Sequence, residues 1–565
     1  MKKYFSLIIF ILIIGIAVVT RLYKLGEAPK GLYVDEAGQG YSAYSILKTG
    51  KDEFGKSYPI VFRSLTDFKT PIYVYLITPL IPLFDLNAFT VRFPSFFLSI
   101  LTLPILYLLI KDLSGNKNLS LLSIGLLAIS PWHILFGRTN FECNVALFFL
   151  LTGVLLFYRG LKKPYLLLIS AIMFAIAIPA YHSQRIITPI VVLSLFIKYR
   201  KTLLEKMYRP YLIAGSFIAI LITIPTLSIA NTPGFLARAS GLNIFSHTRQ
   251  MPDGFIFEYQ GVLSPIINGS WFLSTREFLS LYFSYLSPRY MFFLGDYGPR
   301  SSFPELSTFF IWQYPFYLLG IWFLLKDKKF SNLRFITLLL LLVSPIPGSV
   351  TRDPYSTIRA LPLVVPQIIL ISIGIYELFL KVKNKNWKTI LIVIFSAIIF
   401  YSLLKLHSSV ITLNEYYRAK YWDWGWQQVS ETIDNLKTDL PITIDNARSD
   451  GYLQLAFYQK YDPQKFQADN FEVSTEEYYT NLSRSPEKYI GNIVTKPIVW
   501  ERDLSINQYL VGDELAISKE QILNNKLELV NEILYPDGTV AYRIVKTNPE
   551  FELQKKRIYF NAVNK

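Results

Sequence analysis

Long apolar runs separated by short basic stretches dominate this sequence. IIFILIIGIAVV lies near the start, and FITLLLLLVSPI follows Leu333. Charged residues make up only 17% of the chain, whereas a soluble domain carries about 25%. Apolar runs of this length predict helices that cross a membrane. We therefore expect an all-α polytopic membrane protein.

The apolar runs predict eleven spans, near residues 4–20, 89–110, 118–132, 141–158, 164–181, 184–197, 210–229, 308–325, 333–348, 360–380 and 388–404. Two further apolar stretches, 72–86 and 278–294, contain prolines, and the second also contains Arg289. We expect both to lie at the outer interface as short or re-entrant helices.

The distribution of Lys and Arg predicts the orientation. With a cytoplasmic N-terminus, the inner segments contain 20 Lys and Arg, and the short outer loops contain 4. Basic loops stay on the cytoplasmic side of a membrane. We expect a multi-pass protein of the cell (plasma) membrane with its C-terminal part outside.

Charge and pattern together predict two domains. Residues 1–404 form the transmembrane domain, with large outer loops at 21–88 and 230–307. Residues 405–565 contain 19 Lys and Arg against 23 Asp and Glu, so the net charge of +16 comes from the membrane part. This excess is explained by basic loops and indicates no nucleic-acid partner. WDWGWQQVSETIDNL predicts an amphipathic helix, and PITIDNA and VAYRIVK predict strands, so the tail is expected to be a small α/β domain.

Three carboxylates lie at the predicted outer membrane boundary. Asp35 and Glu36 occur in GLYVDEAGQGYSAY, soon after the first span. A carboxylate here could act as a general base on an acceptor hydroxyl, although an exposed Asp-Glu pair can also be merely solvated. Glu142 begins the fourth span, four residues after Arg138. Its position suits either function or an ion pair that anchors the helix end.

Basic side chains gather at the same boundary. One of them is Arg138. His182 and Arg185 occur in AYHSQR, and Arg352 and Arg359 occur in TRDPYSTIRA. A guanidinium group matches the oxygens of a phosphate, so converging arginines could hold a lipid phosphate. Binding of anionic headgroups is the alternative.

The remaining candidates carry weaker signals. Asp296 and Arg300 lie in FFLGDYGPR, where a glycine- and proline-rich turn also explains the sequence. Cys143 is the one cysteine, and the four histidines have no metal-binding spacing. The chain contains no P-loop, dinucleotide fingerprint or GxSxG motif, which argues against a nucleotide-driven pump.

Several motifs together resemble bacterial glycosyltransferase family 39. They are VDEAGQGYSAYSILKTG, FRSLTDFKTPIYVYL, VRFPSFF, SPWHILFGRTNFECN and YHSQR, followed by FFLGDYGPR and PYSTIRA. The resemblance implies a phospholipid-carrier-dependent enzyme of the GT-C fold, related to protein O-mannosyltransferases and to the aminoarabinose transferase of lipid A. It covers most of residues 20–200 and resumes in the two later motifs.

The resemblance also implies roles for individual residues. Asp35 matches the catalytic base, Glu36 is its neighbour in the motif, and Glu142 matches a second acid on the acceptor side. Lys69 falls where relatives place a lysine near the donor phosphate. Further polar and basic groups around that cavity match Arg138, His182, Arg185 and Arg359. Relatives often have Pro-His where this chain has Pro354-Tyr355.

The implied reaction moves a hexose or pentose from a polyprenyl-phosphate carrier to an acceptor hydroxyl, with inversion, at the outer membrane face. The acceptor could be a protein, a polysaccharide or a lipid. The resemblance leaves open whether the enzyme uses a divalent metal, because some relatives contain one and others do not. A flippase or transporter of lipid-linked sugars is the main alternative, although transporters commonly show internal repeats, and none is apparent here.

Overall fold

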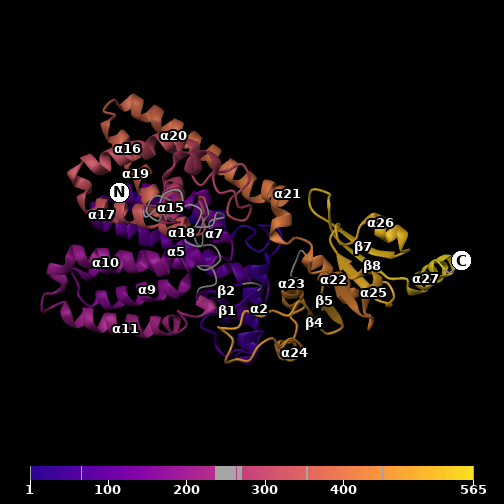
Figure 1. Ribbon diagram of the computed structural model, residues 1–565. Coiled ribbons are helices and arrows are strands. Elements are labelled where there is room, and N and C mark those ends of the chain that lie inside the picture. The colour runs from indigo at the N-terminus through magenta and orange to yellow at the C-terminus, as the bar shows by residue number, and fades with distance from the viewer. Residues whose placement is uncertain are drawn as a thin grey trace. The chain divides into compact units, whose positions relative to one another are not determined.

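The computed structural model describes residues 2–64, 67–235, 263, 270–351, 354–447 and 451–563. Helices make up most of the first 400 residues, and a mixed sheet lies in the C-terminal part (Figure 1). The predicted fold class, a GT-C-like helical membrane protein with a small C-terminal α/β part, is confirmed.

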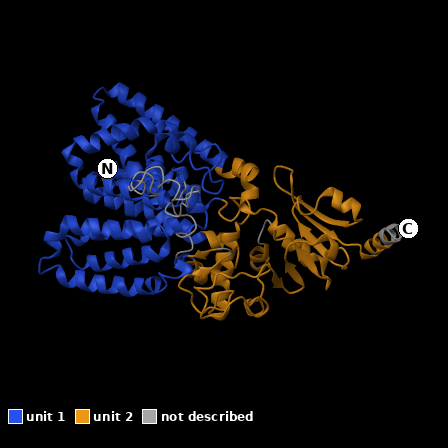
Figure 2. Cartoon of the chain, in the orientation of Figure 1, with its two compact units in different colours: residues 1–23, 70–73, 93–409 blue, residues 24–69, 74–92, 410–565 orange. Residues whose placement is uncertain are grey.

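The chain divides into two compact units, each built from several segments. Unit 1 comprises residues 1–23, 70–73 and 93–409, and unit 2 comprises residues 24–69, 74–92 and 410–565 (Figure 2). The first large loop thus belongs to the same compact unit as the C-terminal part. The predicted boundary at residue 404, between a transmembrane domain and an extracytoplasmic domain, stays a prediction. The two compact units divide the chain differently, because unit 2 also contains residues 24–69 and 74–92.

Unit 1 is a bundle of apolar helices. Its helices are α1 (Lys2–Leu22), α6 (Lys117–Ala128), α7 (Pro131–Arg138), α8 (Glu142–Gly160), α9 (Leu166–Ala180), α10 (Gln184–Leu203), α11 (Arg209–Ser228), α15 (Ser270–Leu286), α16 (Tyr314–Lys326), α17 (Ser331–Val343), α18 (Ile346–Val350), α19 (Val364–Lys381) and α20 (Lys385–His407). Helix α5 (Ala88–Ser114) begins in unit 2 and continues into unit 1. Helices α9, α10 and α11 lie side by side (Figure 1).

Seven described helices are long and apolar enough to cross a membrane, or eight if the bent pair α6–α7 counts as one span. Every one of the eleven predicted spans overlaps a helix, but α9 and α16 have only 15 and 13 residues. The stretch 71–84 is a shorter apolar helix broken by prolines at its centre, in α3 (Pro71–Ile77), a 3₁₀ turn and α4 (Ile81–Phe84). The chain is therefore a multi-pass membrane protein.

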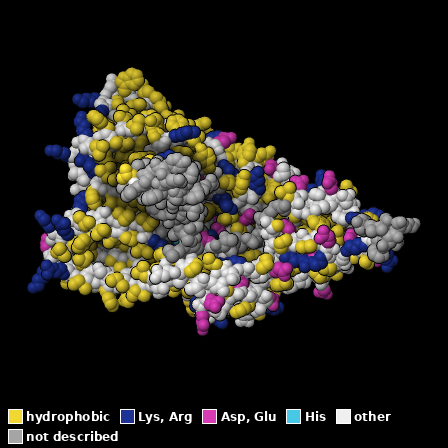
Figure 3. Space-filling view, in the orientation of Figure 1, with side chains coloured by type: hydrophobic (Ala, Val, Ile, Leu, Met, Phe, Trp, Pro, Cys, Tyr) yellow, Lys and Arg dark blue, Asp and Glu magenta, His cyan; other side chains and the backbone are white. Residues whose placement is uncertain are grey.

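Basic residues mark one set of helix ends in unit 1. Helix α10 ends with Arg200 and Lys201, α16 ends at Lys326, and α19 ends at Lys381. In Figure 3, Lys and Arg side chains gather along the left edge of unit 1, while hydrophobic side chains cover much of its remaining face. This distribution is typical of a bundle whose apolar flanks face lipid.

Unit 2 begins with the first large loop. Helix α2 (Val34–Thr49) ends at Gly50, which adopts φ 70° and donates its N–H to the carbonyl of Ile46. A left-handed residue at this position favours glycine because a Cβ would be strained. The loop then forms the short antiparallel ribbon β1 (Phe62–Arg63) and β2 (Phe68–Lys69), in which Phe62 pairs with Lys69.

The C-terminal part of unit 2 is built on a six-stranded sheet of order β4-β5-β3-β6-β8-β7. The strands are β3 (Ile442–Ile444), β4 (Lys488–Ile490), β5 (Ile493–Thr495), β6 (Tyr509–Gly512), β7 (Glu528–Leu534) and β8 (Val540–Lys546). Strand β3 is parallel to β5 and β6, and the other neighbours are antiparallel. All three residues of β3 are buried, as expected for a central parallel strand.

Short helices cover the sheet and carry most of its core contacts. They are α22 (Trp426–Leu436), α23 (Gly451–Tyr458), α24 (Pro463–Asp469), α25 (Trp500–Asp503) and α26 (Lys519–Asn524), with α21 (Asn414–Arg418) before them and α27 (Pro549–Val563) after them. One core cluster joins Trp426, Ile444 and Leu453 to Tyr41 of α2. Apolar packing therefore holds the first loop and the C-terminal part of the chain in one unit.

Candidate active site

The N-terminus of α2 presents two adjacent carboxylates. Asp35 and Glu36 lie in the first turn of this helix, where the helix dipole favours negative charge. Two backbone donors at this helix start also find partners. The N–H of Tyr33 donates to Glu36 Oε2 at 3.2 Å, and the N–H of Val34 donates to Asp423 Oδ2 at 2.8 Å. The start of α2 is thus tied to the C-terminal part of the same unit.

Glu36 is held by a buried arginine. Arg92 Nε and Nη2 donate to its two carboxylate oxygens at 3.0 and 2.8 Å, and both side chains are essentially inaccessible. Arg92 also donates to the carbonyls of Leu25, Pro29 and Gly31. A bidentate pair satisfied on every side fixes geometry and is poorly placed to accept a proton from a substrate.

Asp35 has a different environment. Its Oδ2 accepts a hydrogen bond from Lys69 Nζ at 2.8 Å, and 21% of the Asp35 side chain is exposed. Lys69 is the last residue of β2 and is more deeply buried than Asp35. The structure therefore brings together two residues that are 34 positions apart in sequence and leaves the carboxylate accessible.

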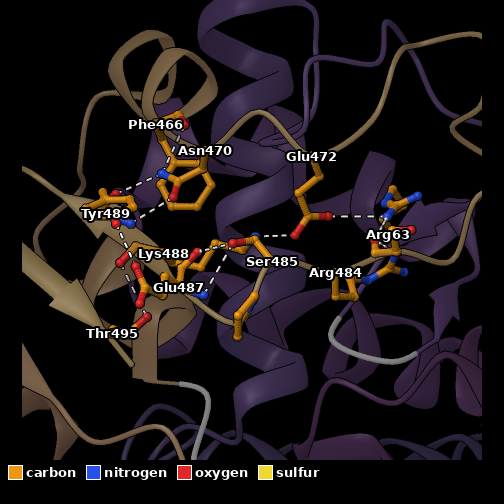
Figure 4. Close-up of polar contacts among 12 residues, drawn as sticks. Arg63, Phe466, Asn470, Glu472, Arg484, Ser485, Glu487, Lys488, Tyr489 and Thr495 are labelled. Carbon is orange, nitrogen blue, oxygen red and sulfur yellow. Dashed lines mark hydrogen bonds and ion pairs between the residues drawn. The ribbon is translucent and has the colours of Figure 1, made fainter. Parts of the chain in front are cut away.

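Arg63 lies in the ribbon that carries Lys69 and binds the segment 472–488; we call these contacts the clamp. The sequence analysis did not identify Arg63. Arg63 Nη2 donates to Glu472 Oε2 at 3.2 Å (Figure 4). The Arg63 N–H donates to the hydroxyl of Tyr478 at 2.7 Å. Further donations reach the carbonyls of Tyr478, Asn481 and Ser483. Lys488 forms a second ion pair with Glu472. The segment 472–488 therefore holds β1, which pairs with the strand of Lys69.

Two buried carboxylates lie beside this clamp. Asp52 accepts hydrogen bonds from the hydroxyl of Tyr478 and from the N–H groups of Phe54 and Lys56. Burial raises the pKa of Asp52 to about 6 despite these bonds. Burial and the neighbouring Asp52 also raise the pKa of Glu53, whose Oε1 accepts from Ser42. Two buried carboxyl groups with raised pKa values therefore lie next to the clamp.

In unit 1, the structure places Arg138 at the end of α7 and Glu142 at the start of α8. Arg138 Nη1 donates to the carbonyls of Thr20 and Arg21, both at 3.0 Å, so it caps the last turn of α1. Glu142 is buried, in a helical first turn that favours an acidic side chain. Arg138 therefore has a structural task in addition to the predicted one.

His182 lies in the turn between α9 and α10, and Arg185 lies in the first turn of α10. Arg185 Nη1 donates to the carbonyl of Phe235 at 3.0 Å, and its guanidinium carbon lies 4.0 Å from the centre of the Phe235 ring. The arginine is thus packed on an aromatic face, an arrangement that keeps its charge and limits its rotamers.

Asp296 joins two of the predicted motifs within unit 1. Its Oδ2 accepts from both the N–H and the hydroxyl of Thr357, at 2.8 and 2.7 Å. Burial raises the pKa of Asp296, while these hydrogen bonds and the charge of Arg359 lower it. The motifs FFLGDYGPR and PYSTIRA therefore meet in space. Arg300 lies in the turn after Asp296, and the prediction for Arg352 lies outside the described residues.

Tyr355 occupies the position where relatives often have histidine. Its ring is buried, stacks 5.4 Å from the ring of Tyr290, and its hydroxyl bonds with Thr308 at 2.8 Å. It thus packs into the joint between the two motifs. Among the described residues, no group of three or more His, Cys, Asp or Glu side chains is arranged to hold a metal ion.

Comparison with known proteins adds an independent line of evidence. Residues 68–229 match the family model described as dolichyl-phosphate-mannose-protein mannosyltransferase. No curated protein sequence matches the chain.

Two solved proteins share its architecture. Apo ArnT from Cupriavidus metallidurans is 11% identical, with a TM-score of 0.54, over 97% of this chain and 99% of ArnT. The same enzyme bound to undecaprenyl phosphate is 11% identical, with a TM-score of 0.50, over 98% of this chain and 99% of ArnT. An oligosaccharyltransferase from Archaeoglobus fulgidus, tethered with an acceptor peptide, is 14% identical, with a TM-score of 0.50, over 96% of this chain and 74% of its own. These identities establish the fold alone.

The fold and the matched segment define a membrane glycosyltransferase of the GT-C fold. Within this class, residues 68–229 are similar to the protein O-mannosyltransferases, and the chain shares the fold of ArnT.

Proposed function

We propose that this enzyme transfers a hexose or pentose from a polyprenyl-phosphate carrier to an acceptor hydroxyl, with inversion at the anomeric carbon. The observation that carries the proposal is the contrast between two neighbouring acids. Asp35 is partly exposed and bonded to Lys69, whereas Glu36 is buried and bonded to Arg92. Only the first carboxylate is accessible for chemistry.

Asp35 acts as the general base. It accepts the proton of the acceptor hydroxyl as the oxygen attacks the anomeric carbon, and the bond from that carbon to the phosphate oxygen breaks. A lysine ammonium has three donors, and Lys69 directs one of them at Asp35. The other two can approach the phosphate and stabilise the anion that leaves.

The lipid carrier is supported by the fold and by an apolar cavity. ArnT, which shares the fold, has been solved with undecaprenyl phosphate. In unit 1, a cavity of about 500 Å³ lies among α8, α9, α10 and α11, lined by residues such as Phe174, Val192 and Ala219. Its apolar walls suit a hydrocarbon chain. We assign the carrier chain to this cavity.

The site is assigned to the outer face of the plasma membrane. Basic residues concentrate at one set of helix ends, and this supports a cytoplasmic location for these ends and for the N-terminus. In this orientation the C-terminal part is extracytoplasmic. His182, Arg185, Arg300, Arg352 and Arg359 remain candidates for contacts with the carrier phosphate.

Turnover of defined donors tests the proposal. Wild type, Asp35→Asn and the control Asp439→Asn, which changes an exposed carboxylate, are purified in detergent and supplied with polyprenyl-phosphate sugars. Release of polyprenyl phosphate is measured. Loss of a general base predicts a decrease of about 10²–10⁴-fold in Asp35→Asn, and no change in the control.

Two outcomes contradict the proposal. Equal turnover by wild type and Asp35→Asn removes Asp35 as the base and makes Glu142 the next candidate. Absence of turnover, combined with movement of lipid-linked sugar across liposomes that contain the protein, identifies a flippase.

A further inference from the structure

A second cavity lies entirely within unit 2. It has a volume of about 610 Å³ and is lined by four short segments, at residues 26–31, 85–89, 423–428 and 457–460. This volume is within the range of about 300–1,000 Å³ that small-molecule sites occupy. Asp423 belongs to this lining and also accepts the hydrogen bond from Val34, the residue before Asp35. The cavity wall is therefore built into the start of α2.

The charges of the lining do not favour an anion. Three acids, Glu27, Asp85 and Asp423, face two cations, Lys30 and Lys460. Both cations already have carboxylate partners, because Lys30 lies 3.4 Å from Glu415 and Lys460 bonds to Asp85. A phosphate or an anionic headgroup would meet a slightly negative wall. A neutral ligand with several hydroxyl groups meets suitable donors and acceptors instead.

An oriented aromatic ring adds a surface for the apolar side of such a ligand. Trp424 is half-buried, and its Nε1 donates to the carbonyl of Leu534 at 3.1 Å, which limits rotation of the indole. Lys30 Nζ lies 4.9 Å from the centre of the ring, so one face already attracts positive charge. The C–H groups of a sugar ring carry partial positive charge and pack on the same kind of face.

Gln428 supplies an unsatisfied acceptor. Its Oε1 is buried and has no hydrogen-bond partner among the residues that the structure describes. Buried polar atoms are almost always bonded, so an unsatisfied acceptor in a cavity wall points to a ligand or water donor. A sugar hydroxyl can donate this bond.

We propose that this cavity binds a neutral sugar ring of a carbohydrate acceptor. The inference rests on the proposed transferase function and specifies its acceptor class, a glycan rather than a protein hydroxyl. Trp424 stacks against the ring, Gln428 accepts from a hydroxyl, and the Asp85–Lys460 pair provides further polar contacts. Through Asp423, the occupied cavity is connected to the turn that presents Asp35.

Binding without donor separates this proposal from catalysis. Full-length protein in detergent is titrated with neutral trisaccharides of mannose, glucose, galactose or N-acetylglucosamine, and tryptophan fluorescence is followed. Calorimetry then confirms each Kd. A Ser/Thr-containing peptide and nanodiscs of phosphatidylglycerol are titrated in parallel. We expect at least one trisaccharide to bind, and neither alternative ligand to compete.

Two variants localise the binding. Gln428→Met removes the unsatisfied acceptor, so the fold is retained while the loss of one neutral hydrogen bond raises Kd about three- to tenfold. Trp424→Ala is expected to raise Kd more than about tenfold, and Trp424→Phe should restore part of the affinity. Gln464→Met, at an exposed glutamine outside the lining, is the matched control and should bind as wild type does.

Several results would overturn the proposal: no trisaccharide binds, binding is unchanged in both Gln428→Met and Trp424→Ala, or these variants weaken peptide or lipid binding instead. Failure of donor turnover combined with intact, cavity-dependent sugar binding contradicts only the transferase proposal.

Discussion

Replacement of Glu36 by glutamine tests whether the two acids of α2 have separate tasks. The Glu36–Arg92 pair is fully buried and bidentate, with bonds of 3.0 and 2.8 Å. Glutamine keeps one acceptor but places a second donor against the guanidinium and removes the negative charge. Arg92 still reaches the carbonyls of Leu25, Pro29 and Gly31.

The expected loss of stability can be estimated from these contacts. Removal of one partner of a buried pair costs about 3–5 kcal/mol, and a single hydrogen bond to a charged group contributes about 1.5–3 kcal/mol. With one acceptor and three carbonyls retained, we expect Glu36→Gln to destabilise unit 2 by about 3 kcal/mol. Asp35→Asn keeps one side-chain oxygen as an acceptor for the largely buried Lys69 and should cost less, about 1.5 kcal/mol.

The assay compares unfolding with turnover for both variants. Apparent unfolding midpoints in detergent are measured beside release of polyprenyl phosphate by the folded fraction. We expect low stability with measurable turnover for Glu36→Gln, and a smaller loss of stability with lost turnover for Asp35→Asn. The double variant Glu36→Gln/Arg92→Met should recover part of the stability, since no buried charge remains. A stable Glu36→Gln protein without turnover would show that Glu36, not Asp35, performs the chemistry.

Three further predictions concern the clamp and the apolar cavity. Because burial raises the pKa of Asp52 to about 6, its contribution to stability is present at low pH and is lost as pH rises through that value. Asp52→Asn should reduce this dependence, leave the part due to Glu53, and raise the unfolding midpoint at pH 8. An Asp52→Asn protein with the wild-type pH profile would refute the assignment. Arg63→Met should destabilise unit 2 by about 3–5 kcal/mol and expose segment 472–488 to limited proteolysis, whereas unchanged cleavage would refute the clamp. Ala219→Trp should raise KM for long-chain donors and leave short-chain donors unaffected, and equal effects on both would show that the carrier chain lies elsewhere.

Hydropathy and charge determined the membrane class and the positions of the helices. Each predicted span overlaps a helix, because apolar length is a local property of the chain. The amphipathic helix at 426–436 and the strands at 442–444 and 540–546 were also predictable from periodicity. The Asp-Glu pair was recognisable, although its two members could not be assigned different roles.

Only the tertiary structure decided those roles, because side-chain partners depend on contacts between distant segments. Arg92 lies 56 residues after Glu36, and Glu472 lies 409 residues after Arg63. The sequence contained one signal for Arg92. It is a charged residue at the start of an apolar span, and a charge in that position requires a partner. No local pattern marked Arg63, the unsatisfied Oε1 of Gln428 or the grouping of the first loop with the C-terminal part. Local composition places helices in a membrane, whereas the packing of remote segments determines which carboxylate is neutralised and which remains accessible.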